Sequence, residues 1–119
     1  MTQGKLNATI RKPEPEVSVI DLQGEVTGQV ENALMDAFAE ASNGTTKTII
    51  LNFNELEYMN SSGIGLLVTL LIRTQRQKQD LVAYGLSEHY QEIFTLTRLD
   101  ETIGTYGSEE QALAAVKQR

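Results

Sequence analysis

The sequence contains no cysteine and a single histidine, His89, among its 119 residues. The absence of cysteine excludes disulfides and thiolate metal sites, and it is typical of a cytosolic protein. Metal chemistry would have to rest on carboxylates, and no spacing of Asp and Glu resembles an ion-binding loop. We therefore expect no metal and no cofactor.

Long apolar runs are also missing. No stretch of 18 apolar residues exists, so nothing is expected to insert into a membrane. The first twelve residues are polar and lack the apolar segment of a signal peptide, which favours a cytoplasmic location.

Positive charge is scarce, and the formal net charge is -6. Such a chain repels nucleic acid and anionic membranes unless a local basic patch reverses the field. The nearest to a patch is Arg73, Arg76 and Lys78, interleaved with glutamines. We expect these cations to be the solvated end of a helix, because cations favour the last helical turn.

Strand and helix patterns alternate along the chain. Strands are predicted at Lys5–Arg11, Val17–Val26, Lys47–Phe53, Leu81–Gly85 and Thr102–Tyr106. Helices are predicted at Thr27–Ser42, Ser62–Gln79 and Ser87–Leu96, with a last one capped by Ser108. Inward residues are predicted to be Val30, Ala33, Leu34, Ala37, Phe38 and Ala41 in the first helix, Tyr90, Ile93 and Phe94 in the third, and Ala112, Leu113 and Val116 in the last.

This alternation predicts an α/β fold with a small, mainly parallel sheet, and the length suits one domain over residues 1–119. The run "KTIILNF" at 47–53 is continuously apolar and should be a central strand. Pro13 and Pro15 indicate either a break in the first strand or an edge position, and the first two strands, joined by this Pro-containing loop, are expected to be the antiparallel part. Functional residues of such sheets gather where strands turn into helices.

The turn after the central strand carries two serines and two glycines, in "MNSSGIGLL" at 59–67. Ser61 or Ser62 is expected to cap the helix that follows. Gly63 and Gly65 lack a Cβ, so a bulky group could approach the backbone there. The first helical turn also carries partial positive charge, which would stabilise a phosphate on a serine.

Helical spacing divides the residues after this turn into two faces. The predicted core face consists of Ile64, Leu67, Val68, Leu71 and Ile72. The other side holds Ser62, Leu66, Thr69, Leu70 and Arg73. This second side is interpreted either as a docking surface headed by a modifiable serine, or as leucines packed under a neighbouring element with a serine that only caps.

Nucleotide binding and catalysis find little support. "SSGIG" is not G-x-G-x-x-G, and no Lys follows as in G-x-x-x-x-G-K-[ST]. A nucleophilic serine in G-x-S-x-G needs glycine two places earlier, where Ser62 has Asn60. His89 has no partner visible in the sequence and is expected to be exposed. We therefore expect no enzymatic activity.

The chain resembles the STAS domain family, in particular the stand-alone anti-sigma factor antagonists of bacteria. The resemblance covers nearly the whole chain, and its motif is a strand followed by D-S-[ST]-G-hydrophobic-G and a helix. It rests on "LQGEVT" at 22–27, "TIILNF" at 48–53, "MNSSGIGLL" at 59–67, "LVAYGLSEHYQEIFTLTRLD" at 81–100 and "SEEQALAAV" at 108–116.

The resemblance implies partner switching in transcription regulation. The unphosphorylated antagonist binds an anti-sigma factor that is a serine kinase; the kinase phosphorylates it and the phosphoprotein is released, until a PP2C-type phosphatase reverses the change. Carried onto this sequence, Ser62 is the phosphoacceptor and Ser61 the second choice. The partner-binding residues are predicted to be Thr27, Asn60, Ser61, Ser62, Gly63, Leu66, Thr69 and Leu70.

Two positions depart from the family pattern. Asn60 stands where the motif usually begins with Asp, and Thr27 stands where another Asp is common. Both departures remove a carboxylate near the serine, while Asn keeps its hydrogen bonding. They favour an alternative, a STAS adaptor that is never phosphorylated and serves a signalling assembly or a lipid-transport complex. A small enzyme or nucleotide-binding protein is the third hypothesis.

Overall fold

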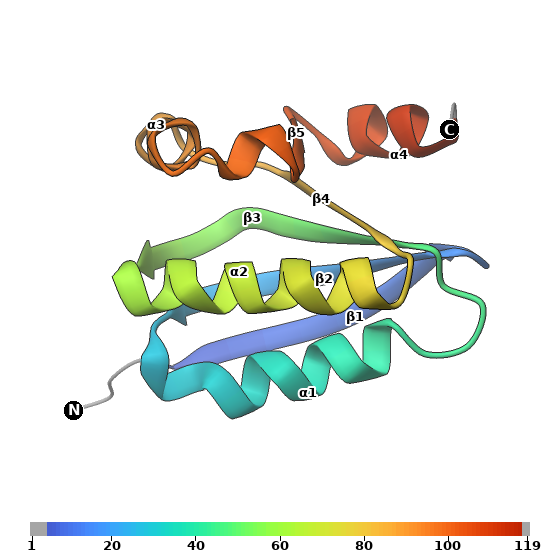
Figure 1. The fold of residues 1–119 in the computed structure, drawn as a ribbon, viewed down its shortest axis with the longest axis horizontal. Coiled ribbons are helices and arrows are strands. Elements are labelled where there is room, and N and C mark those ends of the chain that lie inside the picture. Colours follow the sequence, from blue (N-terminus) through green and yellow to red (C-terminus); the bar gives the residue numbers. More distant parts are fainter. Residues whose placement is uncertain (1–4, 118–119) are drawn as a thin grey trace.

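The computed structural model describes residues 5–117 as a five-stranded sheet covered by helices (Figure 1). The strands are β1 (Leu6–Glu14), β2 (Val17–Val26), β3 (Thr48–Met59), β4 (Asp80–Tyr84) and β5 (Gly104–Tyr106). The helices are α1 (Glu31–Ala41), α2 (Ser61–Arg76), α3 (Glu88–Leu96) and α4 (Glu109–Lys117), with short 3₁₀ turns η1 (Gly28–Val30) and η2 (Leu99–Glu101).

The strands lie side by side in chain order, from β1 to β5. β1 is antiparallel to β2, and the remaining neighbours are parallel. The predicted α/β class, the antiparallel first pair and the central position of β3 are therefore confirmed. Parallel strands need crossover connections, which here are the helices.

Helices cover both faces of the sheet. One face of β3 contributes Ile49, Leu51 and Phe53 to the larger apolar core, which also holds buried residues of α1 and α2. Phe94 of α3 joins this core edge-on to Phe53, with ring centroids 6.2 Å apart. Ile50, on the opposite face, packs in a smaller core with Ala112 of α4. This two-sided burial explains the continuous apolar run in β3.

Two strands are longer than predicted. β3 continues past Phe53 to Met59, because its polar extension still pairs with β2 as far as Val26. β1 runs through Pro13, and its register with β2 is irregular between Arg11 and Glu14. Proline is tolerated there because β1 is an edge strand.

The first helical segment also differs from its prediction. The 3₁₀ turn η1 precedes α1, which begins at Glu31 rather than Thr27. Leu34, Ala37, Phe38 and Ala41 are buried as predicted, whereas Ala33 is exposed. In α4 the predicted Ser108 cap is confirmed, since its hydroxyl accepts from Gln111 N at 3.2 Å.

An ionic cluster ties α4 to the sheet. Arg11 of β1 donates to Asp21 of β2 at 2.6 and 2.9 Å, and to Glu109 of α4 at 2.8 and 3.2 Å. The Tyr84 hydroxyl also donates to Glu109, at 2.9 Å. Asn52 of β3 donates to Asp21 at 2.7 Å. We call these five residues the Arg11 cluster.

The cluster shifts the titration of its members. Hydrogen bonding to Arg11 lowers the pKa of both Asp21 and Glu109, and it raises the pKa of Arg11 itself. Burial, followed by the hydrogen bond to Glu109, raises the pKa of Tyr84 to about 12. At neutral pH, Arg11, Asp21 and Glu109 are thus held in their ionised forms, while Tyr84 keeps its proton and donates a hydrogen bond to Glu109.

Across residues 5–117, no helix combines the length and the apolar composition needed to span a bilayer.

Candidate functional site at the carboxyl ends of β2 and β3

The turn that carries the serines lies beside the turn that carries Thr27. Val26 and Met59 are the last paired residues of β2 and β3, so Thr27 and Asn60 follow neighbouring strand ends. A hydrogen bond from Asn60 N to Val26 O, 3.3 Å long, joins the two turns. The structure therefore brings these two sequence-predicted site residues together at the carboxyl edge of the sheet.

Asn60 caps α2, so the expectation that Ser61 or Ser62 does so is wrong. The side-chain oxygen of Asn60 accepts from Gly63 N at 2.9 Å, and the backbone carbonyl of Asn60 accepts from Ile64 N at 3.0 Å. The helix accordingly begins at Ser61, one residue earlier than predicted. Because Asn60 satisfies the amide, both serines are freed from capping, and both are exposed.

Gly63 fixes how α2 sits on the sheet. It is buried, and a Cβ there would collide with the carbonyl oxygen of Val26 and lie 2.8 Å from Met59 Cγ. Gly65 differs, because it is exposed and a Cβ there would meet nothing within 4 Å. Gly63 therefore serves a close approach of helix and strand, and only Gly65 leaves the helix backbone open to an outside group.

The connection from β2 to α1 reaches Ser62 through Gly28. A Cβ built on Gly28 would lie 3.4 Å from Ser62 Cβ and 3.7 Å from its hydroxyl oxygen. Thr27 is only 8% exposed, and its hydroxyl accepts from Gln29 N at 3.3 Å. Thr27 therefore caps η1 instead of offering a surface contact, and Gly28, which the sequence reasoning missed, is the exposed neighbour of Ser62.

The electrostatic setting of Ser62 favours an anion. The first turn of α2 contains no acidic residue, and its cap is the neutral Asn60. The partial positive charge of the helix N-terminus is therefore not offset by a carboxylate within that turn. A phosphate on Ser62 would lie in this field.

The predicted core face of α2 is confirmed at Leu67, with Ile64 and Leu71 partly buried against the core, and it is wrong at Val68 and Ile72. The alternative, in which Leu66 and Leu70 pack under a neighbouring element, is confirmed for these leucines. Leu66, Leu67 and Leu70 are buried in the larger core, at 7%, 0% and 0% exposure. Val68 and Ile72, assigned to the core face, are 38% and 45% exposed. The buried face is completed by Gly63 and Thr74.

Several residues of the predicted contact surface offer little exposed area. Leu66, Leu70 and Gly63 are buried. Thr69 is half-buried, and its hydroxyl donates to Gly65 O at 3.2 Å. The serines stay exposed, and their role in partner binding remains a prediction.

The exposed side of α2 forms a line that starts at the serines. Ser61, Gly65, Val68 and Ile72 are spaced at helical intervals of four, three and four residues, and all are exposed. We call these four residues the α2 ridge. The ridge thus contains two exposed apolar side chains, Val68 and Ile72, which helical spacing had assigned to the core face.

A metal site and the single histidine are the two other chemical features to consider in the part of the chain that the structure describes. Within residues 5–117, no group of three or more His, Asp or Glu side chains could hold a metal ion. His89 is exposed as predicted, with its ring 4.9 Å from that of Tyr90.

Comparison with known proteins places this geometry in a family. A family model of the STAS domain matches residues 9–112. The anti-sigma factor antagonist SpoIIAA in its unphosphorylated form is 23% identical, with a TM-score of 0.67, 93% of this chain covered and 98% of that one.

Two further solved structures widen the comparison. An anti-sigma factor antagonist from Mycobacterium paratuberculosis is 19% identical, with a TM-score of 0.81 and 95% of each chain covered. The STAS domain of a SulP transporter from Vibrio cholerae is 17% identical, with a TM-score of 0.73, 88% of this chain covered and 84% of that one. At these identities the structures share a fold, and the family match extends over most of the sequence. The chain belongs to the STAS domain family.

Proposed function

We propose that this protein is an anti-sigma factor antagonist that acts by partner switching in the cytoplasm. Unmodified protein binds an anti-sigma factor that is a serine kinase, phosphorylation of Ser62 releases it, and a PP2C-type phosphatase restores the binding form. The protein itself is not an enzyme in this scheme. The observation that carries the proposal is the placement of Ser62: exposed, in the first turn of α2, and next to Gly28 of the neighbouring turn.

The geometry supports Ser62 over Ser61 as the phosphoacceptor. Ser62 lies between the two turns at the sheet edge, so a partner that covers both turns also covers its hydroxyl. Ser61 is the first residue of the α2 ridge, and it lies about 100° around the helix axis from Ser62. Phosphate on Ser62 would place a dianion inside an interface formed with a neutral hydroxyl, which is costly to desolvate.

The proposed partner-binding surface consists of residues that are exposed in the structure. We replace the buried Leu66 and Leu70 with the exposed Val68 and Ile72 of the α2 ridge, and we replace Thr27 with Gly28. The surface then runs from the sheet edge along the solvent side of α2. Apolar contacts along the ridge supply affinity, and Ser62 supplies the point of control.

A phosphorylation assay tests the first step. The protein is incubated with ATP and each kinase-type anti-sigma factor of the same genome, and intact mass is measured. We expect one phosphate on the wild type and on Ser61→Ala, and none on Ser62→Ala. A phosphate that persists in Ser62→Ala and disappears in Ser61→Ala would move the site to Ser61.

A calorimetric titration tests the switch itself. Stoichiometrically phosphorylated protein and unmodified protein are titrated with the same anti-sigma factor. We expect phosphorylation to weaken binding about a hundredfold, in line with a buried charge left unpaired. Equal affinities of the two forms would reject partner switching.

The constitutive STAS adaptor is the second candidate, and Asn60 favours it. Neither Asn60 nor Thr27 supplies the carboxylate that the family pattern places near the serine. Such an adaptor would bind its signalling assembly or lipid-transport complex without modification. If no kinase phosphorylates the wild type, Asn60→Asp is the discriminating variant: gain of phosphorylation would identify the missing carboxylate as the reason.

A further inference from the structure

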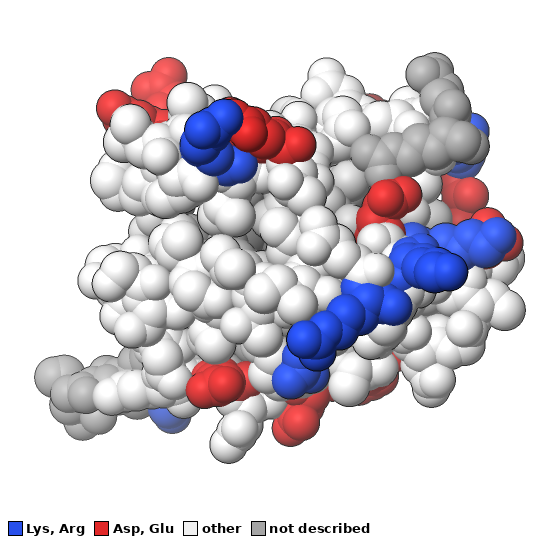
Figure 2. Space-filling view, viewed as in Figure 1, with Lys and Arg blue, Asp and Glu red and all other residues white. Residues whose placement is uncertain are grey.

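Three cations lie together at the carboxyl end of α2. Arg73 and Arg76 are in its last turn, and Lys78 follows with a left-handed backbone, φ 60°. All three side chains are exposed, and Figure 2 shows blue side chains in a row over this end of the helix. We call Arg73, Arg76 and Lys78 the basic row.

The basic row differs from other cations of the protein in its lack of partners. Within residues 5–117, none of its three side chains forms an ion pair. By contrast, Lys47, Arg98 and Lys117 pair with carboxylates at 3.7, 2.9 and 2.9 Å. The chain is acidic overall, at -6, so three unpaired cations side by side are a local reversal of its charge.

Stabilisation of the helix end explains only part of this arrangement. Cations in the last turn do complement the helix dipole, which accounts for Arg73 and Arg76. The dipole does not account for the exposed apolar side chains that lead into the row. Ile72 precedes Arg76 by one helical turn, and Val68 precedes Ile72 by another.

The α2 ridge and the basic row together extend over a length comparable to the width of one protein interface. A helix of 16 residues is about 24 Å long. A standard interface buries about 800 Å² on each partner, a patch of comparable width. A folded partner whose contact area begins at Ser62 and follows the solvent side of α2 is wide enough to reach the far end of the helix.

We infer that Val68, Ile72 and the basic row form a second contact region for the partner, and that the partner presents an acidic surface with an apolar centre there. This inference rests on the proposed function, and it adds the chemistry of the partner. Attraction between the basic row and acidic side chains orients the encounter, while the ridge supplies apolar contact. An anionic membrane is the weaker fit, because two half-exposed apolar side chains and three cations must overcome a net charge of -6.

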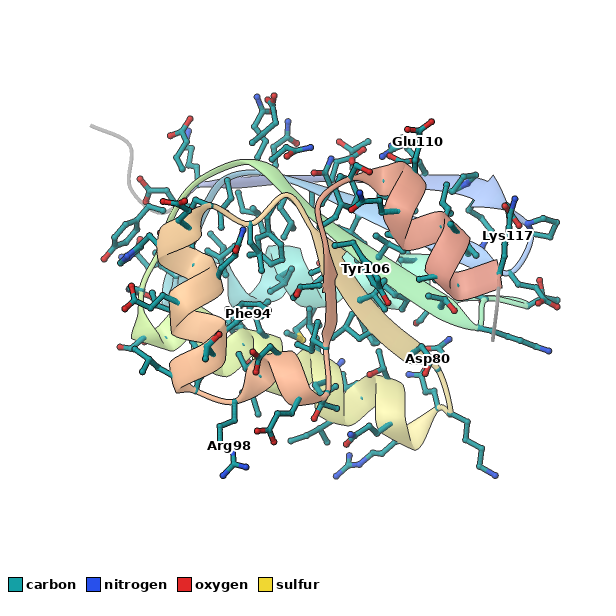
Figure 3. The ribbon with its side chains drawn as sticks, turned by 90° about the horizontal axis from the view of Figure 1, so that it is seen from above. Asp80, Phe94, Arg98, Tyr106, Glu110 and Lys117 are labelled. Atoms are coloured by element: carbon teal, nitrogen blue, oxygen red, sulfur yellow. The ribbon has the colours of Figure 1, made fainter. Side chains whose placement is uncertain are left out.

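Charge reversal at the row provides the test. Affinity for the anti-sigma factor kinase is measured by calorimetry for wild type, Arg73→Glu/Arg76→Glu, and a control, Arg98→Glu/Lys117→Glu. The control makes the same change in net charge at exposed, ion-paired positions on η2's flank and on α4, labelled in Figure 3. Titrations are run at about 50 mM and about 300 mM NaCl, on either side of physiological screening.

We expect the variant of the row to bind at least about tenfold more weakly than the control at low salt, and the difference to shrink at high salt. Arg73→Gln/Arg76→Gln should show a smaller loss in the same direction, and melting curves confirm that each variant is folded. Equal affinities of the row variant and the control would overturn the inference while leaving the proposed function intact. Failure of the wild type to bind any such kinase would remove both.

A vesicle experiment separates the lipid alternative. Vesicles with about 30% phosphatidylglycerol are sedimented with wild type and with Arg73→Glu/Arg76→Glu. No binding of the wild type supports a protein partner. Binding of the wild type that the variant loses, together with unchanged kinase affinity, would assign the row to membranes instead.

Discussion

Two glycines two residues apart in α2 have opposite roles. Gly63 faces the end of β2, where the Val26 carbonyl occupies the space that a Cβ would need. Gly65 faces solvent with nothing within 4 Å of a Cβ position. The motif "SGIG" therefore contains one glycine required by packing and one that packing does not require.

Substitution by alanine should separate the two roles. Gly63→Ala should destabilise the protein by about 1–3 kcal/mol, because helix and strand must move apart. Gly65→Ala should stabilise it by about 0.5–1 kcal/mol, because alanine is the better helix former. Urea titration of both variants measures these changes, and equal losses at the two positions would contradict the assigned packing.

At the scale of the element, α2 shows where periodicity stops being informative. Apolar residues occupy many positions of α2, so helical spacing allows more than one buried stripe. The spacing predicted a stripe through Ile64, Leu67 and Leu71. The buried stripe in the structure runs through Leu66, Leu67 and Leu70. Local pattern cannot choose between stripes rotated by a fraction of a turn. The contact of Gly63 with β2 makes the choice, and that contact is tertiary.

A pair of truncations on α2 checks the corrected face. Leu70→Ala should cost about 2–5 kcal/mol, because the side chain is fully buried. Ile72→Ala, at 45% exposure, should change stability by no more than about 0.5 kcal/mol. A larger loss from Ile72→Ala than from Leu70→Ala, in a denaturant titration, would restore the face that periodicity favoured.

Other elements were predictable where one signal dominated. The central strand, the antiparallel first pair and the Ser108 cap were each specified by local chemistry and are confirmed. The cap of α2 was misassigned because Asn60, Ser61 and Ser62 are all good caps. The extension of β3 to Met59 was missed because polar residues there are held by pairing with β2 rather than by burial.

At the scale of the molecule, the Arg11 cluster connects both ends of the chain. It joins four neighbouring strands, β1 to β4, to α4, the last helix, and it adds ionic contacts to the smaller core. α4 covers only part of its face of the sheet, as the view in Figure 3 shows. Its attachment therefore depends on a small apolar contact together with two ion pairs, of Glu109 with Arg11 and of Lys117 with Glu14.

The cluster predicts a dependence of stability on pH. Arg11 lowers the pKa of Glu109 and of Asp21, so their contributions are present above the ordinary values of 4.5 and 3.8. They are lost as pH falls through the lowered values, when the folded state also takes up protons. We expect the melting temperature of the wild type to exceed that of Glu109→Gln most clearly above pH 4.5, with the gap closing in more acidic buffer.

The neighbouring position supplies the control for this titration. Glu110 is exposed on the next position of α4 and is labelled in Figure 3. Glu110→Gln should leave the pH profile of the melting temperature parallel to that of the wild type. A gap between wild type and Glu109→Gln that stays constant from neutral to acidic pH would show that the cluster does not titrate as described.

The close contact between Gly63 and Val26 has a consequence for how fast a signal could be erased. The helix start is wedged against the strand end, so a phosphate on Ser62 cannot push α2 to a new position without breaking that contact. In the proposed switch, we would therefore expect the two chemical forms to share the same placement of α2 on the sheet. The lifetime of the phosphorylated form would then depend on how fast the phosphatase hydrolyses the phosphoester, and not on a conformational relaxation of the protein.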